Sequence, residues 1–308
     1  MASYITVDGG TTNTRLYLWE EGRMTASLFL PLGARAGLTD KEALPRAMKE
    51  AIASLLEKCK GRVTKILASG MITSESGLCS LPHILAPAGV AELHAAMHEV
   101  VLPEISEIPF VFLRGVKISD GTLAGTDMMR GEETETVGTD AGKDALLILP
   151  GSHSKLIRTD SAGRICDFET LLSGEMMWAL SKDTILADAF SFGACVWCED
   201  ALLDGYRYAR ARGVNAALFK VRVLRNLCGG SEDEAYSFFM GATLADEIAE
   251  VLRLAPLRIV IGGKAAIREP MAAILSHVTS IPVSTLTDEE VALAPSRGAI
   301  RIYEYGAN

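Results

Sequence analysis

The sequence has no apolar run long enough to span a bilayer, and no charged-then-apolar segment of the secretory kind opens it. These two absences predict a soluble, cytoplasmic protein with no membrane partner. Positive charge is also scarce, because 30 basic and 39 acidic side chains leave a net charge of −9 with the two signs interspersed. A surface that binds nucleic acid needs a basic patch to offset phosphate charge, so nucleic acid is not an expected partner.

Cysteine is sparse as well: six residues scattered over 308 are too few for a disulfide scaffold. The single C-x-x-C, Cys195–Cys198, has neither a thioredoxin-like strand before it nor a second ligand pair nearby, which favours reduced thiols over a redox or zinc site. His94 and His98 lie four apart in a predicted helix, a spacing that can chelate a metal. No third ligand lies near them, and the neighbouring acids indicate a solvated face instead.

Three common motifs are missing. There is no G-x-x-x-x-G-K-[ST] and no G-x-G-x-x-G, which removes the simplest nucleotide-binding loops. The stretch 151–155 comes close to the G-x-S-x-G of α/β-hydrolases, but it lacks the second glycine and a strand rather than a helix follows. A hydrolase of that class is therefore disfavoured.

Hydrophobic residues make up 49% of the chain, and its length suffices for two domains of ordinary size. In the first half, apolar periodicity predicts a mixed sheet covered on both faces. The expected elements are strands at 3–8, 14–19 and 25–30, a helix at 41–59, a strand at 63–69, a helix at 89–101, a strand at 108–113 and a helix near 124–136.

The second half begins in the same way and predicts a duplicated βββαβαβα domain. The expected elements are a strand–turn–strand at 145–159, a strand near 164–168, a helical insertion at 169–254, a strand at 257–261, a helix at 264–276, a strand at 281–285 and a helix at 289–304. We expect an α/β protein with a cleft between the two copies. Ligands gather at the carboxyl ends of strands in such sheets, and here those ends carry Asp8, Gly151 and Gly262.

The first of these ends lies in the stretch ITVDGGTTNTRLYLW, residues 5–19. Its two glycines allow a ligand to approach the backbone, and successive N–H groups in such a turn suit an anion. Candidate phosphate-binding residues are Gly10, Thr11, Thr12 and Asn13. Asp8 would repel a phosphate unless Mg²⁺ lay between them, so Asp8 is a candidate metal ligand. An ordinary hairpin turn explains the same residues equally well.

A near copy of this turn strengthens the phosphate interpretation, because two such hairpins can clamp a triphosphate. It consists of Gly151, Ser152, His153, Ser154 and Lys155. A third glycine site at a strand-to-helix junction consists of Gly262, Gly263 and Lys264. These residues either let the backbone approach a base or ribose, or they serve a close helix–strand contact.

This pattern resembles the sugar-kinase branch of the actin-like ATPase superfamily and, within it, the 2-dehydro-3-deoxygalactonokinase family. The stretches that carry the resemblance are VDGGTTNTRLYLW (7–19), SGMITSESGLCSLPHILAPAG (69–89), DMMRGEET (127–134), LPGSHSKL (149–156) and TLLSGEMMWAL (170–180). The second, third and fourth of these, in that order, are much more specific than any one glycine turn. The resemblance implies two ribonuclease-H-like domains flanking an interdomain cleft. One would comprise 1–138 with the C-terminal helix 289–308, and the other 139–288. It also implies ATP and Mg²⁺ as cofactors, and conversion of 2-dehydro-3-deoxy-D-galactonate to its 6-phosphate in galactonate catabolism.

The resemblance also implies roles for residues. Sugar kinases of this kind place a base upstream of the second hairpin, where Asp127 stands, with Glu132 and Glu133 as rivals. Arg130 and Arg15 could orient the substrate's carboxylate, or each could pair with an acid of the protein. Candidate sugar contacts are Gly70, Met71, Ile72, Thr73, Ser74 and Glu132, with His83 and Glu175 on weaker grounds. His153 and Lys155 could neutralise the triphosphate.

The sequence also departs from the family pattern. Leu149 and Pro150 stand where wider relatives carry an acid, which puts a second metal-linked carboxylate in doubt, and Gly9 and Leu156 replace bulky aromatics. Two alternatives stay open: a kinase of another sugar acid, such as 2-dehydro-3-deoxygluconate, or a non-enzymatic actin-like ATP-binding module. The latter would not need the stretches 69–89 and 127–134. The helical insertion is a candidate surface for a homodimer.

Overall fold

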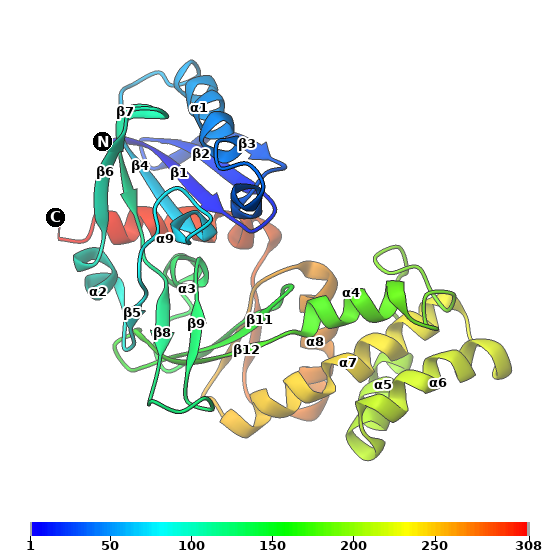
Figure 1. Ribbon diagram of the computed structural model, residues 1–308. Helices are drawn as coiled ribbons and strands as arrows, with labels where there is room; N and C mark the ends of the chain where they lie inside the picture. The colour runs from blue at the N-terminus through cyan, green and yellow to red at the C-terminus, as the bar shows by residue number, and fades with distance from the viewer. Residues whose placement is uncertain (1, 307–308) are drawn as a thin grey trace. The chain divides into compact units, whose positions relative to one another are not determined.

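The computed structural model describes residues 2–306, and its internal contacts divide the chain into two compact units (Figure 1). Of the described residues, unit 1 contains 2–143, 160–167 and 289–306. Unit 2 contains Asp144–Thr159 and Phe168–Asp288. In the described part of the chain, no helix combines the length and apolarity needed to cross a bilayer.

Unit 1 is built on a six-stranded sheet with the order β3-β2-β1-β4-β7-β6. The first hairpin is antiparallel, whereas β1, β4 and β7 run parallel to one another. The strands are β1 (Ser3–Gly9), β2 (Thr14–Glu20), β3 (Arg23–Leu30), β4 (Val63–Gly70), β6 (His98–Leu102) and β7 (Ser106–Phe112). The parallel strands therefore end at one edge of the sheet, where the first glycine turn also lies.

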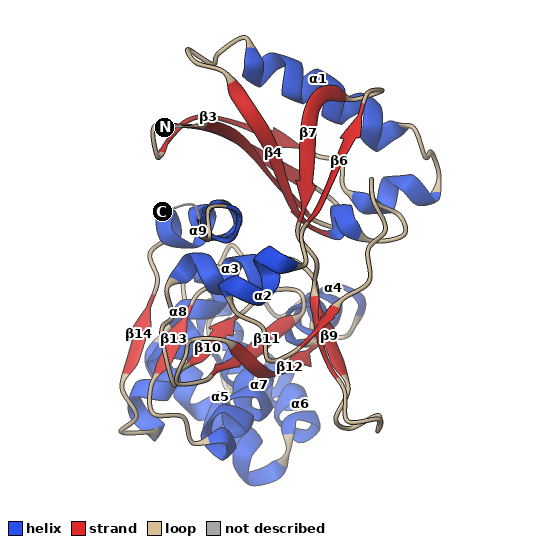
Figure 2. Cartoon of the chain, turned by 90° about the vertical axis from the view of Figure 1, so that its left-hand side faces the viewer, coloured by secondary structure: helices blue, strands red, loops and turns tan. Residues whose placement is uncertain are grey.

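Helices cover both faces of this sheet, as Figure 2 shows for α1 (Ala43–Leu56) and α9 (Asp288–Tyr303). Successive side chains of a strand point to opposite faces. Leu16 and Leu18 accordingly pack in the cluster that contains the apolar face of α1. Tyr17 and Trp19 pack with Leu293 of α9. The near-continuous apolar run of β2 is thus explained by burial on both sides.

Unit 1 also contains a three-stranded sheet of order β5-β8-β9 and several short helices. Its further elements are β5 (Ile84–Leu85), β8 (Val116–Ile118), β9 (Asp127–Met129), α2 (Val90–Ala95), α3 (Glu132–Thr139) and the 3₁₀ helices η1 (Ala34–Leu38) and η2 (Met71–Thr73).

Two helices predicted from the sequence are wrong in part. The predicted helix 89–101 ends as α2 at Ala95, and His98–Leu102 forms an edge strand antiparallel to β7. The alternating exposure of that strand shows why, since period-two burial suits a sheet edge. The predicted helix near 124–136 begins only at Glu132. Asp127–Met129 pairs with β8, and Gly131 at a φ of 112° separates the strand from the helix.

Unit 2 repeats the plan of unit 1. Its sheet has the order β12-β11-β10-β13-β14, with an antiparallel β10–β11 hairpin and parallel β10, β13 and β14. The strands are β10 (Leu146–Leu149), β11 (Ser154–Thr159), β12 (Ile165–Leu171, whose first residues belong to unit 1), β13 (Ile259–Ile261) and β14 (Val283–Thr285). The duplication predicted from the sequence is confirmed at the level of strand pairing.

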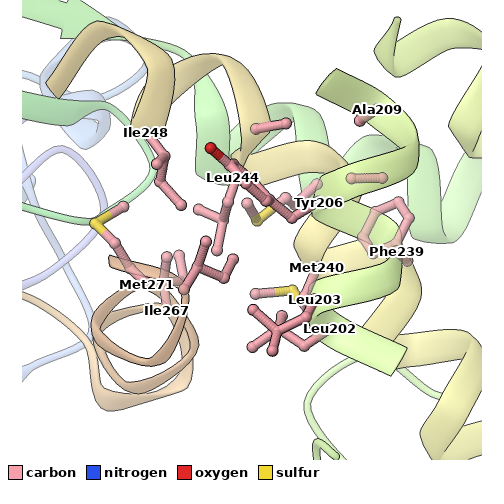
Figure 3. Packing of buried hydrophobic residues seen from close by; sticks show 14 of the residues in the cluster. Leu202, Leu203, Tyr206, Ala209, Phe239, Met240, Leu244, Ile248, Ile267 and Met271 are labelled. Atoms are coloured by element: carbon pink, nitrogen blue, oxygen red, sulfur yellow. The ribbon is translucent and has the colours of Figure 1, made fainter. Parts of the chain in front are cut away.

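The predicted insertion forms the helices α4 (Ser173–Asp183), α5 (Glu199–Arg212), α6 (Val214–Leu227) and α7 (Glu232–Leu254). The helix α8 (Ala265–Val278) follows the insertion and completes the core of unit 2 with them. Figure 3 shows Leu244 and Ile248 of α7 facing Ile267 and Met271 of α8, all buried in one cluster. The helix α7 thus packs both against α8 and against the other helices of the insertion.

Candidate active site

The turn between β1 and β2 is short and internally bonded. Gly10 N donates to Asn13 O at 2.8 Å, and Ala34 N donates to Gly10 O at 3.0 Å. The side chains of Thr11 and Thr12 are exposed. The turn therefore presents two hydroxyl groups to solvent from a backbone that its own hydrogen bonds hold in place.

This turn lies directly beside the loop that follows β4. Gly9 is aligned with Gly70 across the parallel β1–β4 pair. A Cβ atom on Gly9 would lie 2.7 Å from Cβ of Ile72, closer than real contacts allow, so the approach requires glycine. Two segments that the sequence predicts as phosphate-binding and substrate-binding are thus brought together in unit 1.

Within the loop 70–74, burial separates the predicted substrate contacts. Ile72 and Thr73 are buried, and Thr73 Oγ1 donates to Gly70 O at 2.9 Å. Met71 and Ser74 are partly exposed, and Ser74 Oγ donates to Met71 O at 2.7 Å. Only the latter two side chains are placed to contact a ligand, whereas the buried pair shapes the loop.

Carboxylates are crowded around Asp8. Its side chain is 23% exposed and lies 3.5 Å from Nη1 of Arg15. Burial raises the pKa of Asp8, and the charge of Arg15 lowers it. Burial also raises the pKa of Glu135 to about 8, with the charges of Glu132 and Asp8 adding to the effect.

The carboxyl group of Asp8 lies beside the first glycine turn, where its charged form would suit a cation that approaches with a ligand. Among residues 2–306, no three side chains of His, Cys, Asp or Glu are arranged to hold a metal by themselves. Asp8 therefore fits the role of a single protein ligand to Mg²⁺, an ion that keeps waters and takes its other ligands from phosphates.

Arg130 is engaged in holding the loop. Its Nη1 donates to the carbonyl oxygen and to Oγ1 of Thr73 at 2.7 and 2.6 Å, and its Nη2 donates to Leu81 O at 3.0 Å. Glu132 Oε2 accepts a hydrogen bond from Arg130 N at 2.9 Å. The guanidinium is thus directed at the loop rather than at a substrate carboxylate, and burial lowers its pKa.

The candidate bases differ in exposure. Glu133 is fully buried, and its Oε2 accepts a hydrogen bond from Gly131 N at 2.8 Å. Burial, with the charge of Glu132, raises the pKa of Glu133 to about 8. Asp127 lies on β9 rather than in the predicted helix and is partly exposed, with its Oδ1 accepting from Met128 N at 2.6 Å. A base must reach the attacking hydroxyl, so burial disfavours Glu133.

The second hairpin divides into an exposed tip and a buried end. Ser152 and His153 are exposed, and His153 Nε2 lies 3.6 Å from Glu175 Oε1. Lys155 is only 5% exposed, and its Nζ donates to Thr170 Oγ1 at 2.5 Å. The tip is therefore the part of this hairpin that a phosphate group can reach, whereas Lys155 is buried and bonded to Thr170.

Beneath the second hairpin lies Glu247, a residue that the sequence analysis missed. Glu247 is 1% exposed, and Ser173 Oγ at the start of α4 donates to its Oε2 at 2.6 Å. Burial raises the pKa of Glu247. The only signal in the sequence is an acid on the same helical face as Leu244 and Val251 of α7.

The third glycine site adjoins the second hairpin within unit 2. Gly262 N donates to Ile148 O at 2.8 Å, and Lys264 N donates to Pro150 O at 3.2 Å. Gly263 adopts a φ of 65°, which favours glycine. Both segments follow parallel strands, so they share the carboxyl edge of the sheet, where ligands of α/β proteins bind.

The remaining candidates do not form a metal centre. His94 lies in α2, with its Nδ1 2.8 Å from Ile302 O, and His98 lies in β6, so the two do not share one helix. All six cysteines, including Cys195 and Cys198, are free thiols.

Comparison with known proteins assigns this chain to a family. The family described as 2-keto-3-deoxy-galactonokinase matches residues 8–295. A 2-dehydro-3-deoxygalactonokinase from Escherichia coli (strain K12) is 25% identical over 256 residues, which cover 81% of this chain and 80% of that protein.

Solved structures show the same fold. A Sinorhizobium meliloti protein provisionally named a 2-dehydro-3-deoxygalactonokinase matches with a TM-score of 0.79 and 23% identity over 98% of both chains. A xylulose kinase from Lactobacillus acidophilus matches with a TM-score of 0.57 and 11% identity, over 100% of this chain and 90% of that one. The mixed α/β fold of this chain is therefore the fold of these two structures. With the match extending over residues 8–295, the chain belongs to the 2-keto-3-deoxy-galactonokinase family.

Proposed function

We propose that this protein transfers the γ-phosphoryl group of ATP to the 6-hydroxyl of 2-dehydro-3-deoxy-D-galactonate, a step of galactonate catabolism. The observation that carries this proposal is the family match over residues 8–295. The exposed hydroxyls of Thr11 and Thr12 and the exposed tip of the second hairpin are consistent with it, because phosphoryl transfer asks the protein mainly for positioning and charge neutralisation.

Each unit has a glycine turn that is a candidate nucleotide contact. In unit 2, Ser152 and His153 would donate to phosphate oxygens, while Gly262 and Gly263 let the backbone approach the adenosine. One structural neighbour supports a nucleotide on this fold. It is an activator of 2-hydroxyisocaproyl-CoA dehydratase from Clostridium difficile, which matches with a TM-score of 0.51 and whose structure is named as having ADPNP bound. In unit 1, Thr11 and Asn13 are the candidate phosphate contacts.

Mg²⁺ fits this proposal as an ion held by Asp8, directly or through water. When bound, the ion supplies positive charge that offsets the phosphates and the crowded carboxylates. Asp8 lies at the end of β1, beside the turn that carries Thr11 and Thr12, so an ion bound there would adjoin the candidate phosphate contacts.

The proposed base is Asp127, which would accept the proton of the attacking hydroxyl. Glu132 is the alternative, since it is also partly exposed and lies beside the Arg130 backbone. Met71 and Ser74 would contact the sugar. We place the reaction in the cytoplasm, where ATP is available, and the homodimer expected from the helical insertion stays a prediction.

The test is a coupled assay for ADP release by the purified protein with ATP and Mg²⁺. The acceptors are 2-dehydro-3-deoxy-D-galactonate, its gluconate epimer, D-galactonate and no sugar. We expect the galacto acid to give the highest kcat/KM and a 6-phosphate product by ³¹P NMR. A higher value for the epimer would reassign the substrate, and ADP release that no acid stimulates would refute the kinase.

The base is tested by comparing Asp127→Asn with Glu132→Gln. We expect Asp127→Asn to lower kcat by about 10²- to 10⁴-fold while the affinity for ATP is retained. If only Glu132→Gln produces that loss, Glu132 is the base instead.

A further inference from the structure

A sugar acid brings a carboxylate into unit 1, and the two arginines predicted to receive it are already engaged. The guanidinium of Arg130 donates to Thr73 and Leu81, as described above. Arg15 is paired with Asp8 at 3.5 Å. Because Asp8 offsets the charge of Arg15, an anionic substrate needs a cation elsewhere at this edge of the sheet.

Arg114 is a cation at that edge. It lies two residues after the end of β7, a parallel strand whose carboxyl end adjoins that of β4. Hydrogen bonds hold the backbone on both sides, since Leu113 N donates to Ala68 O and Ile84 N donates to Gly115 O, each at 2.9 Å. The backbone from which the Arg114 side chain extends is therefore held in place by hydrogen bonds to neighbouring segments.

The guanidinium of Arg114 has no protein partner in the described chain. The side chain is only partly exposed, and its Nε atom is buried without a hydrogen bond. No ion pair involves it among residues 2–306. A buried donor without a partner costs about 1–3 kcal/mol, so an unpaired arginine at a ligand-binding edge indicates a ligand that completes it.

The surroundings of Arg114 are the predicted sugar-contact segments. A Cβ atom on the adjacent Gly115 would lie 2.7 Å from Cδ2 of His83 and 2.4 Å from Met129 O. The charge of Arg114 also acts on the thiol of Cys79 and lowers its pKa, against a larger rise from burial. Gly115 thus lies between His83 and β9, and the side chain of Arg114 acts on Cys79 of the loop 71–83.

We propose that Arg114 binds the carboxylate of the sugar-acid substrate and so selects acids over neutral sugars. A planar guanidinium matches a carboxylate with two parallel hydrogen bonds, which orients the substrate as well as holding it. Arg130 then serves as a positioning residue that stabilises the loop 71–83, and Arg114 makes the contact. The assignment rests on the proposed function, because it identifies the substrate as an acid.

The test is Arg114→Met, assayed with the sugar acid, with its carboxamide and with ATP as the varied substrate. We expect the KM for the acid to rise by about 10- to 150-fold, the value for a lost charged hydrogen bond. The KM for ATP and the kcat/KM for the carboxamide should change less than threefold. Lys117→Met, which removes an exposed positive charge three residues away, is the matched control and should leave all three values unchanged.

Arg114→Lys keeps the charge but loses the planar pair of donors, so its KM for the acid should rise severalfold. This variant decides the question if Arg114→Met does not fold. An unchanged KM for the acid in either folded variant, or an equal loss with acid and carboxamide, would overturn the inference.

Binding of the sugar acid without ATP, measured by calorimetry, separates this inference from the proposed function. If the wild type turns over no sugar acid but binds one in a manner that Arg114→Met abolishes, the proposed function fails and the carboxylate site stands. If Arg114→Met binds the acid as well as the wild type does, the carboxylate site fails, whatever the wild type phosphorylates.

Discussion

Replacing Glu133 by glutamine tests whether the buried carboxyl group at the start of helix α3 is protonated at neutral pH. Glu133 is fully buried in the first turn of α3, and one of its carboxyl oxygens, Oε1, has no hydrogen-bond partner. Burial raises its pKa from the ordinary 4.5 to about 8. At neutral pH the folded protein therefore holds a proton at Glu133 that the unfolded chain releases.

This bound proton makes the free energy of unfolding depend on pH. The folded state binds more protons than the unfolded state between pH 4.5 and about 8, so the stabilisation is fully present below pH 4.5 and is lost as the pH rises through about 8. A difference of about 3.5 pKa units at about 1.4 kcal/mol each corresponds to at most about 5 kcal/mol. Glutamine cannot ionise, so Glu133→Gln should lack this dependence.

The assay is guanidinium chloride unfolding of both proteins from pH 5 to 8.5. Trp178→Phe and Trp197→Phe are introduced in both, so that the buried Trp19 reports on unit 1. We expect the free energy of unfolding of the wild type, relative to Glu133→Gln, to fall by up to about 1.4 kcal/mol per pH unit and to level off above pH 8.

Glu50→Gln on the exposed side of α1 controls for the loss of a surface carboxyl group. A wild-type minus Glu133→Gln difference that stays constant across this range, or that rises with pH, would refute the buried neutral carboxyl group.

Three further variants test the packing and the proposed site. Gly138→Ala places a Cβ atom 1.8 Å from Ala294 O where α3 contacts α9, so we expect a loss of about 1–3 kcal/mol in thermal unfolding, against little change for Gly61→Ala. Glu247→Leu leaves the buried hydroxyl of Ser173 without its acceptor and should lower the melting temperature more than Glu247→Gln; equal melting temperatures would contradict this. Asp8→Ala should raise the Mg²⁺ concentration needed for half-maximal ADP release, and an unchanged Mg²⁺ titration would remove Asp8 as a ligand.

The two hairpins that carry the glycine turns were readable from the sequence because local pattern alone sets them. The alternation and the glycine turns at 9–10 and 151 predict two hairpins, and both appear as antiparallel pairs. The helices α1, α8 and α9 were also predictable, since each has an apolar stripe of helical period. The motifs that indicated the family were likewise local, and the family match confirms that identification.

Sequence pattern failed where a neighbour in space decided the structure. Residues 98–102 are compatible with a helix, but pairing with β7 makes them a strand. Arg130 was expected to orient a substrate, yet its side chain donates to carbonyl groups of Thr73 and Leu81, at least 49 residues away in the chain. No local pattern encodes such partners.

The sequence by itself thus determined the hairpins, the duplicated order of elements and the family. The tertiary structure decided which polar side chains are free to meet a ligand. It buried Glu133 and Lys155, engaged Arg130 with the loop, and left the guanidinium of Arg114 without a protein partner among the described residues. The physical reason is that charge and hydrogen-bonding capacity are properties of a residue, whereas burial and partners are properties of the fold.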